Sequence, residues 1–235
     1  MLKMCDVDVD IEASRILRKV TLEAGPGELV CLIGRNGAGK TTTLRTVMGY
    51  RRPAGGTITL GGETIAGLPT HAIAARGVGY APEESGVFGD LTVAENIELA
   101  TWTRPAGRPA AERVARAYDV FPRLRGLAAR GGTQLSGGER KMLSIARALA
   151  LDPQMLLLDE PFEGLSPAII PAVSDGIAQI TRLGHAVLLA ESNIHHVPEY
   201  TTRLYVIERG EIVFAGTPDD AWRDTTVLRI IGGTR

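Results

Sequence analysis

The stretch LVCLIGRNGAGKTTTLRTVM, residues 29–48, decides the fold of this chain. Its first five residues are apolar and predict a buried strand, whereas Lys40–Met48 predicts a helix that ends near Gly49. Between them, Gly34–Thr41 matches the pattern G-x-x-x-x-G-K-[ST]. A strand, a glycine-rich turn and a helix in this order are typical of a loop that binds phosphate groups.

The residue types in this loop explain how it would hold a nucleotide. Glycines let the backbone curl so that successive N–H groups point toward phosphate oxygens, and the start of the following helix adds its positive end. Lys40 supplies a point charge for the β- and γ-phosphates, and the Thr41 hydroxyl is suited to bind Mg²⁺. We therefore predict that the chain binds ATP with Mg²⁺ through Gly34, Asn36, Gly37, Ala38, Gly39, Lys40, Thr41 and Thr42.

Two acidic residues follow a second apolar run, Met155–Leu158. A hydrophobic strand beside the loop strand would carry Asp159 to the Mg²⁺ ion as a second metal-side group. Glu160 lies one residue further, where a carboxylate can orient and deprotonate the attacking water. A strand followed by a solvated acidic turn gives the same pattern, so the prediction of ATP hydrolysis depends on the glycine-rich loop as well.

Composition and charge argue against several other classes of protein. The chain has 235 residues, 44% of them hydrophobic, and a formal net charge of -1. Coating of nucleic acid is disfavoured, because that binding depends on many Lys and Arg contacts to phosphate. No apolar stretch approaches the roughly 20 residues of a membrane-spanning helix, and the early charges from Lys3 onward do not fit a signal peptide. The two cysteines fit a reducing compartment, and Cys31 in the loop strand is expected to be a buried hydrophobic residue.

The remaining sequence predicts an α/β protein. The first 24 residues alternate in polarity and predict two half-buried strands joined by a turn. Residues 84–135 carry helical patterns rich in Ala and Arg and predict a mostly helical insertion. Because strand and helix patterns then alternate, a parallel sheet is favoured. The elements expected outside the loop are strands at Thr57–Leu60, Met155–Leu158 and Ala186–Ala190, helices at Thr92–Thr103 and Ala110–Val120, and a hairpin of Leu204–Ile207 with Ile212–Phe214.

A second helix start that could face phosphate lies at residues 135–139, which read LSGGE. The Ser136 hydroxyl and the amides of Gly137 and Gly138 are suitable donors at the N-terminus of a helix from about Arg140 to Ala150. When this motif is taken alone, a Ser N-cap on an ordinary helix is the simpler interpretation.

Together these motifs resemble the ATP-binding cassette (ABC) ATPases, in order and over the whole chain. The resemblance implies a P-loop NTPase nucleotide-binding domain of the ABC type, with an N-terminal antiparallel β subdomain and a helical subdomain insertion. It implies one domain over 1–235, in which 1–83 and 136–235 form the core and about 84–135 the helical part. In this family two such domains pack head to tail, so Ser136 and Gly138 are expected to act on the ATP of the partner subunit.

Three positions narrow the resemblance within the family. Glu83 stands where the family usually has the Gln of its Q-loop, and Ser166 replaces the usual Asp of the D-loop. Ser192 stands at the switch position, which most members fill with His. The Q-loop and D-loop residues, and Glu191 and Asn193 on either side of Ser192, are similar to the ATPases of branched-chain or hydrophobic amino acid uptake, in particular the LivF type. The switch residue of that type is usually Gln, so Ser192 departs even from that pattern. The resemblance implies that Glu160, Lys40 and Ser192 carry catalysis and that Glu83 reaches the metal-bound water.

Two of the chain's departures from the family suggest how its site differs. Ser192 is shorter than His and uncharged near neutral pH, so we expect weaker transition-state stabilisation and an asymmetric heterodimer in which this chain's own site turns over slowly. By spacing, Ile11 occupies the place where the family commonly stacks adenine on an aromatic ring. Losing that stacking, roughly 0.5–1.5 kcal/mol, predicts modest discrimination between ATP and GTP. His195 and His196 are expected to be polar residues on a short helix before Pro198, in preference to a shifted replacement for the switch His.

The leading hypothesis for function is an ATP-binding and ATP-hydrolysing subunit of an importer for branched-chain amino acids or related small polar or hydrophobic solutes. Its expected partners are a second ABC ATPase subunit, transmembrane permease subunits and, indirectly, a periplasmic solute-binding protein, but no nucleic acid. Its expected location is peripheral, at the cytoplasmic face of the inner membrane. A nucleotide-binding regulatory module with weak turnover is one alternative. A soluble ABC ATPase acting on nucleic acid is another, although the long coiled coils or second cassette usual in that class do not fit in 235 residues.

Overall fold

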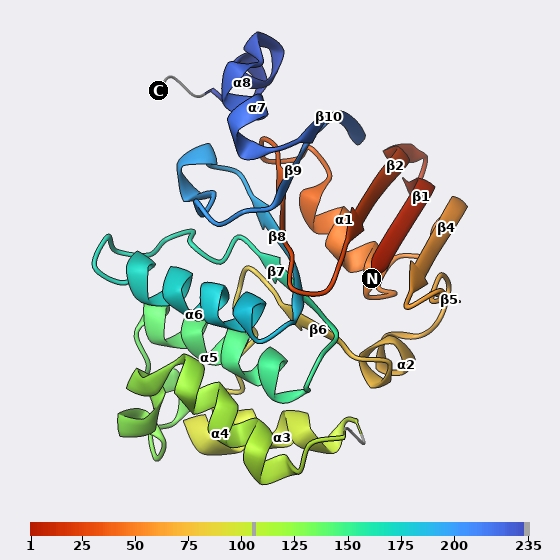
Figure 1. The fold of residues 1–235 in the computed structure, drawn as a ribbon. Coiled ribbons are helices and arrows are strands. Elements are labelled where there is room, and N and C mark those ends of the chain that lie inside the picture. The colour runs from red at the N-terminus through yellow and green to blue at the C-terminus, as the bar shows by residue number, and fades with distance from the viewer. Residues whose placement is uncertain (105–106, 233–235) are drawn as a thin grey trace.

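A central sheet carries helices on one side and an N-terminal β layer on the other (Figure 1). The computed structural model describes residues 1–104 and 107–232. The strands are β1 (Leu2–Ile11), β2 (Ser14–Ala24), β3 (Leu29–Ile33), β4 (Gly55–Leu60), β5 (Glu63–Thr64), β6 (Val78–Ala81), β7 (Met155–Asp159), β8 (Ala186–Glu191), β9 (Arg203–Glu208) and β10 (Glu211–Gly216). The helices are α1 (Lys40–Val47), α2 (Thr70–Ala75), α3 (Val93–Trp102), α4 (Ala110–Val120), α5 (Gly137–Ala150), α6 (Ile170–Arg182), α7 (Pro218–Arg223) and α8 (Thr225–Ile231), with short 3-10 turns η1 (Pro122–Leu127), η2 (Gly132–Gln134) and η3 (Ile194–His196).

Strand order in the larger sheet corrects one expectation. The six strands run in the order β10-β9-β3-β8-β7-β6, with parallel pairing from β9 through to β6. The expectation that the strand of Asp159 lies beside the loop strand is therefore wrong, because β8 lies between β3 and β7. Helix α1 nevertheless packs across both β8 and β7. Its N-terminus thus brings Thr41 to the end of β7.

The loop strand is apolar throughout because both of its faces are covered, as parallel strands in α/β proteins require. Leu29, Cys31 and Ile33 belong to a core shared with α5 and α6. Val30 and Leu32 belong to a second core shared with the N-terminal β layer and α1. Cys31 is fully buried, as the sequence predicts.

The N-terminal layer is a four-stranded antiparallel sheet in the order β2-β1-β4-β5. The predicted pair of strands in the first 24 residues and the strand near Thr57–Leu60 are confirmed, and so is the closing β9–β10 hairpin. Buried side chains of β1 and β2, among them Leu2, Met4 and Leu17, pack toward the larger sheet. The α/β fold with an antiparallel N-terminal layer is thus confirmed.

Between residues 84 and 135, the regular elements that the structure describes are helical: α3, α4, η1 and η2. Helix α3 begins with a capping box in which the Thr92 hydroxyl accepts from the Glu95 amide. Helices α3 and α4 pack against α5 (Figure 1). Helix α5 begins at Gly137, three residues before the predicted start at Arg140, because Ser136 and Glu139 form a second capping box. Within the described residues, no helix is both long and apolar enough to cross a membrane.

Candidate active site

The glycine-rich loop joins the end of β3 to the start of α1 and can be built only with glycine at certain positions. Gly37 and Gly39 have φ angles of 80° and 116°, a region that side chains rarely adopt. A Cβ on Gly34 would lie 2.4 Å from the Ile207 carbonyl oxygen, so a side chain has no room there. Around Gly37 nothing lies within 4 Å of a Cβ, so the loop is open on that side. A loop of this form leaves backbone N–H groups available to phosphate oxygens.

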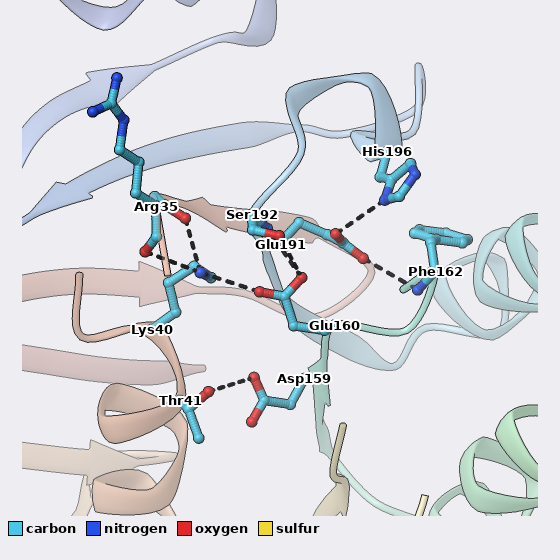
Figure 2. Close-up of polar contacts among 10 residues, drawn as sticks. Arg35, Lys40, Thr41, Asp159, Glu160, Phe162, Glu191, Ser192 and His196 are labelled. Carbon is cyan, nitrogen blue, oxygen red and sulfur yellow. Dashed lines mark hydrogen bonds and ion pairs between the residues drawn. The ribbon is translucent and has the colours of Figure 1, made fainter. Parts of the chain in front are cut away.

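Lys40, the first residue of α1, lies between the loop and the acidic end of β7 (Figure 2). Its Nζ donates to the carbonyl oxygens of Gly34 and Arg35 at 2.8 and 3.3 Å, and lies 3.1 Å from Glu160 Oε1. Both charged side chains are only 5% exposed. The ammonium group is thus held by loop carbonyls on one side and by a carboxylate on the other.

The metal-side groups converge as expected, in spite of the strand between them. The Thr41 hydroxyl donates to Asp159 Oδ1 at 3.1 Å, and the Tyr80 hydroxyl donates to Asp159 Oδ2 at 3.0 Å. Burial raises the pKa of Asp159, and Tyr80 and Thr41 oppose that shift by donating to the carboxylate. Sequence reasoning missed Tyr80, because the short strand β6 that carries it has only four residues and was not recognised.

This donor set fits Mg²⁺. In the described part of the chain, no three His, Cys, Asp or Glu side chains converge as a metal site of their own. Mg²⁺ at nucleotide sites is commonly held by one or two protein groups together with substrate phosphates. One hydroxyl, from Thr41, and one carboxylate, from Asp159, next to a phosphate loop therefore match this ion.

Glu160 is held in place on all sides. Its Oε2 accepts from the Ser192 amide at 3.0 Å and from the Ser192 hydroxyl at 3.1 Å. Its own amide donates to the Ala190 carbonyl at 2.9 Å, and its φ of 47° lies in the left-handed region. A non-glycine residue in this region carries backbone strain, which persists only where the surroundings hold it. The switch residue Ser192 thus contacts the carboxylate directly.

Lys141 of α5 is a second residue that sequence reasoning missed. It is buried, and its Nζ donates to the carbonyl oxygens of Glu83 and Glu160 at 2.7 and 3.0 Å. Its cation lies among the carboxylates of the site, and desolvation lowers its pKa. The pKa of Glu83 is raised, first by burial and then by neighbouring carboxylates. Nothing in the local pattern singles out Lys141, because its contacts come from two distant loops.

A cavity of about 230 Å³ lies over the loop, and it brings most of the predicted residues together. It is lined by Ile16, Asn36, Gly37, Gly39, Lys40, Thr41, Thr42, Glu83, Glu160 and Glu163. Glu83 lines the same cavity as Thr41, and its predicted contact with a metal-bound water stays a prediction.

Five predicted nucleotide contacts do not line this cavity: Gly34 and Ala38, which belong to the loop itself, and Ile11, Ser136 and Gly138, which lie outside it. Ile11 does not line this cavity, because it pairs with Ser14 at the turn of the N-terminal hairpin; Ile16 is the residue of that hairpin at the cavity. The predicted contact of Ile11 with a base stays a prediction, and Ile16 is a further apolar residue of this hairpin that lines the cavity. Ser136 and Gly138, at the start of α5, also do not line it. Their action on a partner's nucleotide stays a prediction.

The two adjacent histidines, His195 and His196, both lie on the expected short helix, η3. His196 is 24% exposed, and its Nδ1 lies 3.2 Å from Glu191 Oε2. Its ring also meets the Phe162 ring edge-on, with centroids 5.9 Å apart. His196 thus lies on the expected short helix and in addition turns its ring toward the end of β8, a contact that the sequence did not predict.

Comparisons with known proteins agree with this geometry. A family model described as ABC transporter matches residues 17–163. The chain is 36% identical over 224 residues to the lipopolysaccharide export system ATP-binding protein LptB of Haemophilus influenzae, covering 94% of this chain and 92% of that one. It is 39% identical over 201 residues to the high-affinity branched-chain amino acid transport ATP-binding protein BraG of Pseudomonas aeruginosa, covering 86% of each. A solved ATP-binding subunit of an ABC transporter superposes with a TM-score of 0.84 at 29% identity, covering 97% of this chain and 94% of that one.

Proposed function

The chain belongs to the ABC transporter family of ATP-binding cassettes, which bind and hydrolyse ATP, and from this premise we propose that it drives an importer for branched-chain amino acids or related small polar or hydrophobic solutes. The observation that supports the importer proposal is the similarity to BraG. Of the two relatives named above, BraG has the higher identity to this chain, although LptB aligns over more residues. Glu83 at the Q-loop position and Ser166 at the D-loop position support the same class.

For the reaction itself, we assign the roles from the contacts. The loop amides and Lys40 hold the β- and γ-phosphates, and Thr41 with Asp159 holds the metal. Bound Mg²⁺ would neutralise charge on the phosphate oxygens. Glu160 serves as the general base for the attacking water, with Ser192 fixing one oxygen of its carboxylate.

The ion pair between Lys40 and Glu160 suggests how binding of ATP activates Glu160 as the general base. A γ-phosphate in the loop competes with Glu160 Oε1 for the Lys40 ammonium, 3.1 Å away. Once the ammonium turns to phosphate, Oε1 is released to accept a proton from water. Oε2 keeps its two donors from Ser192, so the carboxylate does not move away. Substrate binding and activation of the base are thereby linked.

ABC ATPases dimerise and work with transmembrane subunits. We propose that the transmembrane subunit docks in a cavity of about 850 Å³ between α1, α3 and α5. Its lining combines the cations Arg45, Arg51 and Arg147 with exposed rings of Tyr50 and Phe88. Arg147 lies over the Phe88 ring, 5.1 Å from its centroid. A short cytoplasmic helix with one apolar face and an acidic side chain fits this lining, and it would place the chain peripherally at the cytoplasmic face of the membrane.

We further propose that the working dimer is a head-to-tail heterodimer, fed indirectly by a periplasmic solute-binding protein, in which this chain's own site is the slower one. Ser192 supports this asymmetry, because its hydroxyl is engaged by Glu160. Substitution of the general base in each subunit separately tests it. If Glu160→Gln in this chain abolishes all ATPase activity and the equivalent change in the partner does not, the asymmetry is wrong.

Reconstitution tests the importer. The tagged chain is co-purified with its membrane subunits and placed in proteoliposomes, and ATP-dependent transport of radiolabelled leucine, isoleucine and valine is measured. We expect uptake of at least one of them, and none with the Lys40→Ala chain. Lipopolysaccharide export is the second candidate, favoured by the longer alignment with LptB. Release of lipopolysaccharide without amino acid uptake would replace the first proposal by the second.

A further inference from the structure

Behind Glu160 lies a second layer of side chains that the assigned reaction does not use. Glu191 ends β8, is fully buried, and has both carboxyl oxygens engaged (Figure 2). Its Oε1 accepts from the Phe162 amide at 3.2 Å, and its Oε2 lies 3.2 Å from His196 Nδ1. One carboxyl group thus joins η3 to the turn that follows Glu160.

The protonation of Glu191 explains why a histidine suits this place. Burial raises the pKa of Glu191 to about 9, and the neighbouring carboxylates of Glu160 and Glu163 act in the same direction. A carboxyl group that keeps its proton has one donor that needs an acceptor. The unprotonated Nδ1 of a neutral imidazole is such an acceptor, whereas Lys and Arg offer only donors. With Nδ1 as the acceptor, His196 would take the hydrogen bond of this proton, while Glu191 Oε1 accepts from the Phe162 amide.

The hydrogen bond between Glu191 and the Phe162 amide supports the turn that carries Glu160. Glu160 itself is strained at φ 47°, and only Pro161 separates it from Phe162, whose amide donates to Glu191. The His196 ring also packs edge-on against the Phe162 ring, at 5.9 Å between centroids. His196 therefore contacts the turn twice, through Glu191 and through the Phe162 ring.

We propose that His196 is a positioning residue for Glu160, acting through the buried Glu191 carboxyl group and the Phe162 amide. In this chain, His196 would then partly replace the missing switch histidine by supporting the turn that carries Glu160. Ser192 holds the Glu160 carboxylate directly. The proposal rests on the assigned role of Glu160 as general base. It concerns the placement of the base, so it predicts an effect on turnover and none on nucleotide affinity.

Two substitutions separate the hydrogen bond from the bulk of the ring. His196→Asn keeps a polar group near the position of Nδ1, whereas His196→Leu keeps volume but offers Glu191 no partner. In the full-length chain, we expect His196→Leu to lower the single-turnover rate of ATP hydrolysis about tenfold, as misplacement of a catalytic group does. The affinity for ATP should change less than twofold, and His196→Asn should recover most of the rate. Equal rates for wild type and His196→Leu, or an asparagine variant as slow as the leucine one, overturn the proposal.

A measurement that needs no turnover gives an independent decision. Hydrogen exchange of the peptide that contains Phe162 reports directly on its amide bond to Glu191. We expect exchange there to be several-fold faster in His196→Leu and unchanged in His196→Asn; equal exchange in all three proteins overturns the proposal. Glu160→Gln in the same series separates the two assignments. Full turnover in Glu160→Gln means that the role of Glu160 is wrong, whereas a dead Glu160→Gln beside a fully active His196→Leu means that only the role of His196 is wrong.

Discussion

The ion pair between Lys40 and Glu160 should stabilise the fold in the absence of nucleotide, and its strength can be measured. The perturbation is Lys40→Met, Glu160→Gln and the two together. Lys40→Met leaves the buried Glu160 carboxylate with only the two donors of Ser192. Glu160→Gln leaves the ammonium bonded to two loop carbonyls. The double variant contains neither charge, so it should be little worse than Lys40→Met alone.

The expected magnitude follows from the separation and the burial. At 3.1 Å, an effective dielectric constant of about 20 gives an attraction of about 5 kcal/mol, from which the cost of desolvating two charges that are each 5% exposed must be subtracted. Removing one partner of a buried pair costs about 3–5 kcal/mol, because the other charge stays buried. We therefore expect Lys40→Met to lose about 3 kcal/mol of unfolding free energy, with a coupling energy of about 2 kcal/mol.

Urea denaturation of the four nucleotide-free proteins measures the coupling as a double-mutant cycle. The matched control is the surface pair of Arg15 and Asp10, which are closer, at 2.8 Å, but 48% and 40% exposed. The cycle of Arg15→Met and Asp10→Asn should show a far weaker coupling than the buried pair, because solvent screens exposed charges. If the buried pair couples no more strongly than this control, the reasoning from burial is refuted.

Three further predictions test the loop, the core and the buried acid. Gly39→Ala should lose about 1–3 kcal/mol of unfolding free energy, because the φ of Gly39 is 116°. Gly137→Ala is the control and should change the unfolding free energy by less than about 0.5 kcal/mol, because a Cβ at Gly137 meets only open space. Thermal unfolding of the two variants measures the difference. At pH 8, iodoacetamide should label the exposed Cys5 and leave Cys31, because burial raises the pKa of Cys31 to about 12; mass spectrometry of the native protein showing both thiols labelled would contradict this. Glu191, with its pKa raised to about 9, binds its proton more tightly in the folded state, so its stabilising effect is present below the unfolded pKa and is lost as pH rises toward 9. Between pH 6 and 9, the unfolding free energy measured by urea denaturation should therefore fall more steeply with pH for wild type than for Glu191→Gln, by up to about 1.4 kcal/mol per pH unit. Parallel pH dependences of the two proteins would count against a protonated Glu191.

Much of the site could be predicted because its chemistry is local in the chain. Gly34–Thr41 forms its loop from consecutive residues, so spacing alone identified the loop and the helix that begins at Lys40. Asp159 and Glu160 were found in the same way, at the end of an apolar run. Ile16 was missed because spacing from the N-terminus does not reveal the hairpin register, which brings Ile16 to the cavity, whereas the role of Ile11 stays a prediction.

The sequence by itself predicted the residues for phosphate and metal, since each motif there is a continuous segment whose backbone conformation follows from its own residues. Only the tertiary structure decided what holds Asp159 and Glu160 in place. Tyr80, Lys141 and His196 reach the site from β6, α5 and η3, which are far apart in the chain and meet through the strand order β3-β8-β7-β6. No local pattern encodes that order, because it depends on how the strands pack together. The glycine-rich loop could therefore be predicted from the sequence, whereas the contacts that hold Glu160 in place could not.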